Sequence, residues 1–369
     1  MATYMVSQVP VEVPVAGYPT VELVAALESK VNWTLLRTAL KQAKLPVGLG
    51  WKALASNAEE ATPEGSRLRK FLSDFFDETI IAGERYVQIY SVEKSFIDSL
   101  LKAIEKSTPL KSEFSEKYPL PLDLKSIRAA PSSPTLCEIR NFPNGDVSLV
   151  FCAAGYFDDR NVYESNQLSD LVKKAYDGID RLITVRKTYY QSYDVITVRR
   201  QLERIEISVD QPSKLVGARF EDRPMEILTS GALHFSDFVG FGAKAPDNLF
   251  PAMSAIYTEP KEGRVVFLAF RTLTGSIKRE RMTRDDDDLR DEIFHQAGME
   301  AVGQDIKPYE LEAEWNFKAP DGVGTVKLHG LISQLASQDP TLHGCYVKAH
   351  QISSFERTLN RLMTFTSKP

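Results

Sequence analysis

The stretch TLCEIRNFPNGDVSLVFCAAG, residues 135–155, carries the strongest local signal for the fold. Two alternating runs flank an Asn144-Gly145 pair, and an Asn-Gly pair in this setting is typical of a tight β-hairpin. Strands joined by such a turn run antiparallel. The stretch therefore predicts an antiparallel strand pair in this part of the chain.

Further strand segments follow the hairpin. Residues 182–210 are rich in β-branched and aromatic side chains and predict two or three strands, and residues 264–282 and 309–317 predict more. Strands and helices do not alternate strictly along the sequence. We therefore predict a mostly antiparallel α+β fold rather than a doubly wound α/β fold.

The first 106 residues have a different character. Apolar residues recur at helical spacing within residues 20–30, 32–44, 64–76 and 93–106, and one strand is expected near Tyr86. Five prolines interrupt the periodicity between 107 and 134. The predicted organisation is a mainly helical region 1–106, a Pro-rich loop or linker 107–134, and a β-rich α+β region 135–369.

Composition limits the classes of function. The 369-residue chain is 43% hydrophobic and 26% charged, which is typical of a folded core. Its net charge of −5 argues against a protein that coats nucleic acid without sequence preference. No apolar run approaches the roughly 20 residues that span a bilayer, so no membrane partner is expected. The three widely spaced cysteines favour reduced thiols and a cytoplasmic location.

Motifs that would announce an enzyme are missing. The sequence contains no GxSxG, no HExxH and no P-loop, and the His343/Cys345/His350 group lacks the paired spacing of a zinc site. The run Asp285–Asp288 is interpreted as the acidic first turn of a helix. We predict no cofactor and no metal, and we favour a non-enzymatic protein.

Two net-positive segments stand out within the acidic chain. Residues 181–204 contain six basic and two acidic residues, and residues 264–284 contain six basic and one acidic residue. Guanidinium groups contact phosphates and tyrosines stack on bases, so we predict a nucleic-acid or other polyanion surface if the two segments pair or lie close together. The predicted binding residues are Arg186, Lys187, Tyr190, Arg199, Arg200, Arg271, Lys278, Arg279 and Arg281.

Alternatives remain at this point. The basic strands are also consistent with solvated sheet faces that pair with acids elsewhere in the chain. A second hypothesis is an interaction or scaffold protein whose basic strands meet an acidic protein partner or a second copy of the chain. A third is a metal-dependent hydrolase or nuclease, because Glu310, Glu312 and Glu314 alternate along one strand, although this pattern is also typical of an ordinary half-buried strand.

Overall fold

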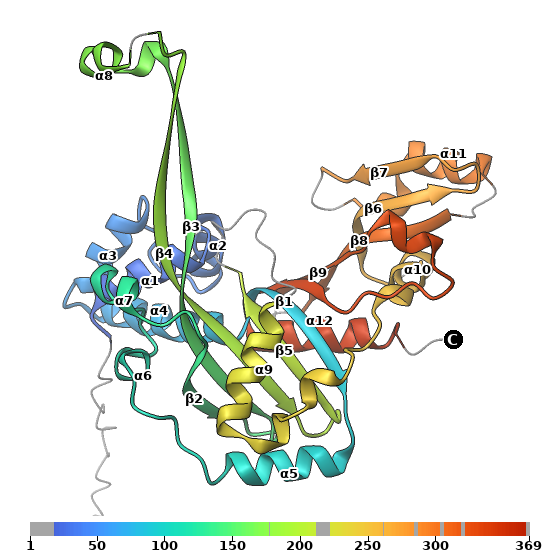
Figure 1. Cartoon of the computed structure of the whole chain (residues 1–369), viewed down its shortest axis with the longest axis horizontal. Helices are drawn as coiled ribbons and strands as arrows, with labels where there is room; N and C mark the ends of the chain where they lie inside the picture. Colours follow the sequence, from blue (N-terminus) through green and yellow to red (C-terminus); the bar gives the residue numbers. More distant parts are fainter. Residues whose placement is uncertain are drawn as a thin grey trace, which may run out of the picture. The chain divides into compact units, whose positions relative to one another are not determined.

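The structure is a computed structural model that describes residues 18–176, 178–211, 222–260, 262–283, 287–302, 306–318 and 322–366 (Figure 1). The chain divides into two compact units, with the boundary between Phe76 and Asp77. None of the helices within these ranges is both long and apolar enough to cross a membrane.

The first unit is helical. Its elements are α1 (Thr20–Lys30), α2 (Trp33–Gln42), α3 (Trp51–Glu59) and most of α4 (Pro63–Ile81). The Asn32 side chain caps α2 by accepting a 2.7 Å hydrogen bond from the Thr34 N–H. The predicted apolar stripes pack inward, since Leu27, Leu36 and Leu72 are fully buried. The helix α3 did not figure among the predicted elements.

The second unit is built on one ten-stranded sheet, and every neighbouring pair is antiparallel. This confirms the predicted α+β class. In spatial order the strands are β2 (Thr135–Asn141), β3 (Val147–Glu164), β4 (Arg181–Arg199), β5 (Arg204–Asp210), β1 (Gly83–Ser91), β10 (Cys345–Ala349), β9 (Gly322–His329), β8 (Ile306–Phe317), β6 (Arg264–Thr272) and β7 (Ile277–Arg281).

The predicted hairpin is present as β2–β3. Gly145 has φ +86°, in the left-handed region that glycine tolerates best, and its N–H donates to the Phe142 carbonyl at 3.0 Å. The Phe142 N–H donates in turn to the Asp146 carbonyl at 2.9 Å. The Asn-Gly pair therefore closes the turn as the sequence indicates.

Two hydrophobic cores of the described residues meet opposite faces of β1. Because alternate residues of a strand point to opposite faces, Tyr86 and Tyr90 of β1 enter the first core while Val87 and Ile89 enter the second. Helices α5 (Lys94–Ile104) and α9 (Arg223–His234) contribute to the first core, and α10 (Phe250–Thr258) and α12 (Ile352–Met363) to the second. Strand β1 is common to both.

The remaining helices are short. Residues 107–134 form α6 (Glu113–Lys117) and α7 (Leu124–Ala129), which bury Phe114 and Ile127. Helix α8 (Asp170–Ala175) lies between β3 and β4, and α11 (Ile293–Ala301) follows β7.

The helix expected to begin at Asp285 begins later. Residues 284–286 lie outside the described ranges, and Asp287 and Asp288 are not helical. Asp288 instead caps the short 3-10 turn at Leu289–Asp291 by accepting from the Arg290 N–H. The cap of α11 is Glu292, which accepts a 2.7 Å hydrogen bond from the His295 N–H. The prediction of the helix start at Asp285 is therefore wrong.

Candidate interaction surfaces

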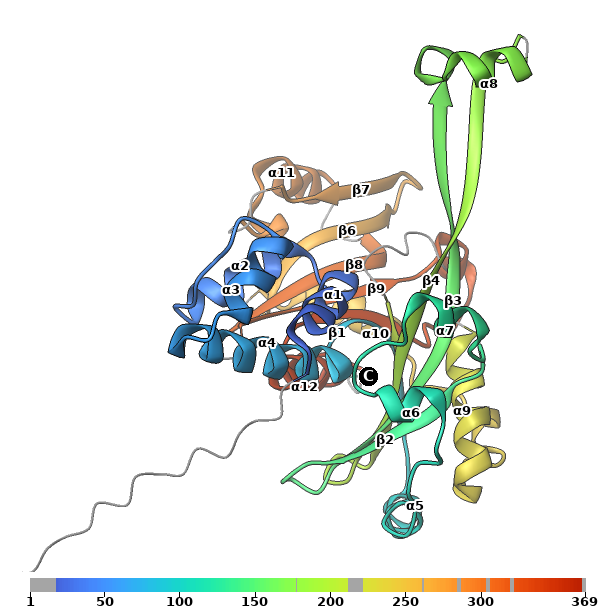
Figure 2. The same cartoon turned by 90° about the vertical axis from the view of Figure 1, so that its left-hand side faces the viewer.

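The strands β3 and β4 extend well beyond their neighbours and form a projecting arm (Figures 1 and 2). Strand β2 pairs with β3 only up to Cys152, and β5 pairs with β4 only from Val195 onward. Residues 155–164 pair with 181–190 alone. We call residues 155–190 the arm, and residues 165–180, which include α8, the arm tip.

The charges of the arm neutralise one another across the strands. Lys187 lies opposite Asp158, Arg186 opposite Asp159, and Arg181 opposite Glu164, to which it forms a 3.1 Å ion pair. The arm contains six basic and six acidic residues. The predicted binding residues Arg186 and Lys187 are exposed, but the facing acids cancel the positive charge counted along β4 alone.

One face of the arm carries three exposed aliphatic side chains among charged ones, since Asp158, Arg160, Glu164, Arg181 and Lys187 lie on the same face. Val162, Ile183 and Val185 share this face and retain 50%, 57% and 56% of their exposed surface, respectively. Tyr156, nearer the sheet on the same face, lies 4.0 Å below the Lys187 ammonium group, measured to the ring centroid. We call Val162, Ile183 and Val185 the apolar arm face.

Tyr190, predicted as a stacking residue, packs at the base of the arm on the opposite face. A Cβ atom at Gly155 would lie 2.5 Å from Tyr190 Cζ, so this glycine makes room for the ring. Burial and the nearby Asp194 and Asp210 raise the pKa of Tyr190 to about 12. Its half-buried position makes it a packing residue of the arm rather than an open stacking platform.

Arg199, one residue before the exposed Arg200, belongs to the interior. It is 2% exposed and binds Glu206 at 2.9 Å, Asp146 at 3.1 Å and also Glu356. Arg204 holds the other oxygen of Glu206, with a 2.7 Å hydrogen bond from its Nε. Burial raises the pKa of Glu206, but Arg199 and Arg204 outweigh this effect, so that its pKa is lowered overall. Arg199 is thus unavailable to an external polyanion.

The second basic segment is matched by the alternating glutamates of β8. Arg281 binds Glu312 at 2.7 Å, and Arg264 binds Glu314. Glu310 lies within 3.9 Å of Arg279. These glutamates are therefore engaged by arginines, which disfavours their use as a nuclease metal site.

Glu310 has two further cationic neighbours on β9. It contacts Lys327 at 3.1 Å and His329 at 2.7 Å. Burial raises the pKa of Glu310, yet its hydrogen bonds to His329 and Lys327 lower it overall. Among the predicted residues, Arg271 is half-buried and Lys278 exposed, and neither forms an ion pair within the described ranges.

The two basic segments neither pair nor share one surface. Five strands separate β4 from β6, and six inter-strand steps of about 4.8 Å place them roughly 30 Å apart. The sequence leaves open whether the two segments share one face, and the strand order places them on separate parts of the sheet. The plainer interpretation, solvated strands paired with acids elsewhere, describes most of these cations.

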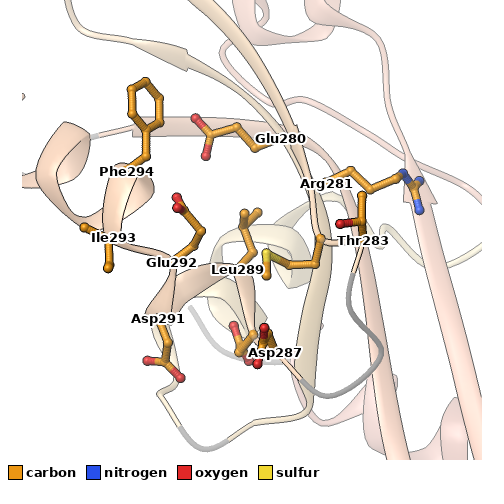
Figure 3. A pocket seen from close by; sticks show the side chains of 11 residues that line it. Glu280, Arg281, Thr283, Asp287, Leu289, Asp291, Glu292, Ile293 and Phe294 are labelled. Atoms are coloured by element: carbon orange, nitrogen blue, oxygen red, sulfur yellow. The ribbon is translucent and has the colours of Figure 1, made fainter.

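A pocket of about 790 Å³ lies between the end of β7 and the start of α11 (Figure 3). Its lining includes five carboxylates and one guanidinium group: Glu280, Asp287, Asp288, Asp291, Glu292 and Arg281. The Arg281 side chain extends away from Asp291 and Glu292 in Figure 3 and is bound to Glu312. We call this site the acidic pocket.

Hydrogen bonds favour the charged form of two carboxylates of the acidic pocket, Asp288 and Glu292. Burial raises the pKa of Asp288, but hydrogen bonds from Arg290 outweigh it and lower the pKa. Backbone hydrogen bonds from His295 and Phe294 lower the pKa of Glu292. The pocket is therefore negatively charged near neutral pH.

A buried relay supports one wall of the acidic pocket. His295 Nδ1 lies 2.5 Å from Glu280, and its Nε2 lies 2.9 Å from the Tyr257 hydroxyl. Burial and Glu280 raise the pKa of Tyr257 despite an opposing effect of Arg290. The two contacts of His295 therefore hold the Glu280 side chain in place.

Comparison with known proteins assigns no family to this chain. No protein-family model matches the chain, and no curated protein matches it either. Within the described ranges, no group of three or more His, Cys, Asp or Glu side chains is arranged to hold a metal ion.

Proposed function

We propose that this protein is a non-enzymatic assembly protein that binds a protein partner, or a second copy of itself, through its arm. The observation that carries the proposal is the apolar arm face on a projecting, charge-balanced hairpin. Two-stranded hairpins without further packing are marginally stable in water. A partner that covers this arm would stabilise it and remove its apolar side chains from solvent.

The magnitudes favour a protein partner. Full burial of a valine or isoleucine contributes about 1.5–3 kcal/mol, so covering the remaining half of each side chain contributes about 1 kcal/mol. The three residues of the apolar arm face then supply about 3 kcal/mol, before any contact made by the tip. Balanced charge on the arm adds no repulsion against a protein surface.

A polyanion surface has weaker support. Phosphate binding draws its affinity from cations that release counterions, and cations already facing carboxylates contribute less. Of the nine predicted residues, Arg200 and Lys278 are exposed without a facing acid, and they lie on different parts of the sheet. The cytoplasm remains the proposed location, supported by three buried cysteines that form no disulfide.

Excision of the arm tests the proposal. Phe157 and Thr188 lie directly opposite each other, so an Asn-Gly turn can replace residues 158–187 without altering the part of the sheet that β2 and β5 cover. We expect the full chain to elute with a second copy or a bound protein, and the shortened chain to elute alone. Far-UV circular dichroism checks that the sheet is retained.

A triple substitution tests the same surface without shortening the chain. Val162→Thr, Ile183→Thr and Val185→Thr keep β-branched side chains while making the apolar arm face polar. Thr184→Ser, on the opposite face, is the matched control and should leave assembly unchanged. A full-length chain that stays monomeric and free of bound protein at all concentrations would refute the proposal, as would an arm-excised chain that still assembles.

A further inference from the structure

The outer edge of β3 within the arm is open between two residues whose N–H groups have partners. Near the base, the Ala154 N–H donates a 3.0 Å hydrogen bond to the Pro131 carbonyl. Near the tip, the Glu164 N–H donates a 3.0 Å hydrogen bond to the Gln167 side chain. Alternate residues of a strand direct their N–H and C=O groups to the same edge, so the residues between these points that face outward are Tyr156, Asp158, Arg160 and Val162. Among the described residues, their backbone groups form no hydrogen bond on this edge.

This open edge lacks three features that keep natural edge strands from associating. Residues 155–164 contain no proline and no lysine, and their register with β4 runs without a bulge. Figures 1 and 2 show no other strand beside this edge. Such an edge binds an extended strand by continuing the ladder of backbone hydrogen bonds, a mode of recognition known as β-augmentation.

The opposite edge of the arm, along β4, is less suited to a second copy. Residues 181–190 contain three cations and no acid, so two such edges would bring like charges together. Pairing of this edge with β3 of a second copy is also obstructed near the base, because β5 already occupies the position beside β4. Self-association through the β3 edge is therefore favoured.

We propose that two copies of the chain pair antiparallel through the open edge of β3, about a two-fold axis at Asp159. This deepens the proposed function, on which it rests, by naming a second copy as the partner and this edge as the surface. In this register Asp158 lies opposite Arg160 of the second copy, and Tyr156 lies opposite Val162 of the second copy. All four open residues of each chain are then paired, and each pair exchanges two backbone hydrogen bonds. The contact is isologous, so assembly closes at a dimer.

The side chains support the same register. Asp158, which faces Lys187 in its own chain, lies between that lysine and Arg160 of the second copy. Val162, part of the apolar arm face, packs against the Tyr156 ring of the second copy. A shift of the axis by one residue removes the Asp158–Arg160 pairs, and it places an open residue of each chain opposite a residue whose N–H already has a partner.

Two aspartates meet at the axis, on the other face of the arm. Asp159 lies opposite Asp159 of the second copy, but each also faces Arg186 of its own chain. These guanidinium groups reduce the repulsion between the two carboxylates. The affinity therefore comes from the backbone hydrogen bonds and the flanking pairs rather than from the central one.

Amide hydrogen exchange resolved to single residues tests the open edge directly. As the protein concentration rises, exchange at the four open N–H groups should slow about tenfold or more, because pairing removes them from solvent. The N–H groups of Phe157, Asp159 and Asn161 point to β4 and should be protected at every concentration, which makes them the internal control. If the open N–H groups exchange at the same rate at all concentrations, the inference is wrong.

A proline at the edge tests the contact by light scattering after size-exclusion chromatography. Asp158→Pro removes an open N–H, and edge strands tolerate proline where the N–H faces solvent. Lys187→Pro is the matched control, because Lys187 lies directly opposite Asp158 and its N–H points to the outer edge of β4, as that of Tyr193 does toward Asp210. We expect Asp158→Pro to raise the dissociation constant of the dimer about tenfold or more. Lys187→Pro should change it by less than about twofold.

A charge exchange keeps the inference testable if proline disturbs the arm itself. In Arg160→Glu, the new carboxylate faces Asp158 of the second copy. In the double variant Asp158→Lys with Lys187→Glu, the facing charges within one chain are exchanged, and the new cation faces Arg160 of the second copy. Each variant alone should dimerise about fivefold or more weakly than the unmodified chain. A 1:1 mixture should recover the affinity, because opposite charges then meet at both pairs, and a mixture that stays monomeric would overturn the register.

The outcomes separate this inference from the proposed function. If the arm-excised chain is monomeric while Asp158→Pro and both charge variants dimerise like the unmodified chain, the arm binds through another surface, and only this inference is wrong. The same conclusion follows if the full chain carries a different protein on its arm and never a second copy. If the arm-excised chain still assembles, or the full chain stays monomeric and free of bound protein, the proposed function is wrong as well.

Discussion

Replacing Arg199 with methionine is the sharpest test of the distinction between binding cations and structural cations. If Arg199 contacts an external polyanion, Arg199→Met should weaken binding and leave folding unchanged. If it is the centre of a buried ion cluster, the main loss should be in the free energy of unfolding. Methionine keeps most of the length of the side chain and removes only the charge and the hydrogen bonds.

The magnitude follows from the partners of Arg199. Its guanidinium group contacts Glu206 at 2.9 Å, Asp146 at 3.1 Å and also Glu356. Removing one partner from a buried ion pair costs about 3–5 kcal/mol, because the remaining charge is left without compensation. We therefore expect Arg199→Met to lower the free energy of unfolding by about 3–5 kcal/mol at neutral pH. The neighbouring Arg200→Met, at an exposed position, should change it by less than about 0.5 kcal/mol.

The loss should depend on pH in a defined direction. The pKa of Glu206 is lowered in the folded protein from an ordinary value of 4.5, so its ionised form contributes stability above pH 4.5. That contribution disappears as the pH falls through the lowered pKa, when the carboxylate is protonated. The difference between the unmodified chain and Arg199→Met should therefore be largest at neutral pH and smaller near pH 4.

Urea titrations provide the measurement. The sequence contains three tryptophans, and Trp33→Phe with Trp51→Phe leaves Trp315, whose indole N–H donates to Glu262 at 2.5 Å in the second unit. Fluorescence in that background then reports on the sheet unit alone. Surface substitutions usually change the free energy of unfolding by up to about 0.5 kcal/mol. If the free energies of unfolding of Arg199→Met and Arg200→Met differ by less than that amount, Arg199 is not the centre of a buried ion cluster.

Three further predictions use the same fluorescence assay. Arg85→Met should lower the free energy of unfolding by about 3 kcal/mol or more. The reason is that Arg85 is fully buried and donates hydrogen bonds to the carbonyls of Ala82 and Thr79, at 2.9 and 3.0 Å, at the end of α4. A loss below about 1 kcal/mol, the contribution of one ordinary hydrogen bond, would contradict this. Gly145→Ala should cost about 1–2 kcal/mol, since φ is +86° in the hairpin turn, and an unchanged midpoint would count against it. Burial lowers the pKa of His350 from 6.5 to about 4, so the free energy of unfolding should fall as the pH is lowered from 6.5 to 4. His350→Leu should make this pH dependence weaker. If the free energy of unfolding of His350→Leu depends on pH as steeply as that of the unmodified chain, His350 is not the source.

The sequence contains enough local information to predict individual elements but not their order in the sheet. The Asn144-Gly145 pair and the amphipathic helices depend on neighbours in the chain, and the structure contains them. Strand β1 was expected within a helical region, yet it lies between β5 and β10 in the sheet. Its position depends on tertiary contacts, because both of its faces are buried and a single strand does not specify its partners.

The basic segments illustrate the same limit at the level of side chains. Counting charges gives Arg199 and Arg200 equal weight, although Arg199 lies in a part of β4 that is buried on both faces, whereas Arg200 lies in the exposed turn that follows. The acids that neutralise Arg281 and Lys187 lie on other strands, so only the register reveals them. The arm was not predicted, because the sequence does not show that β3 and β4 would contain 18 and 19 residues, whereas strands commonly contain about 5–6.

The central position of β1 also affects how the chain is made. Gly83 pairs with Ala349, which lies 266 residues later, so during synthesis β1 leaves the ribosome long before its partner β10 exists. During that interval, the unpaired backbone groups along one edge of β1 and the apolar side chains of Val87 and Ile89 are exposed and can contact other chains. We expect the amides of the β1–β10 ladder to gain protection last when refolding is followed by pulsed hydrogen exchange, and nascent chains that stop before Cys345 to require chaperones to remain dispersed.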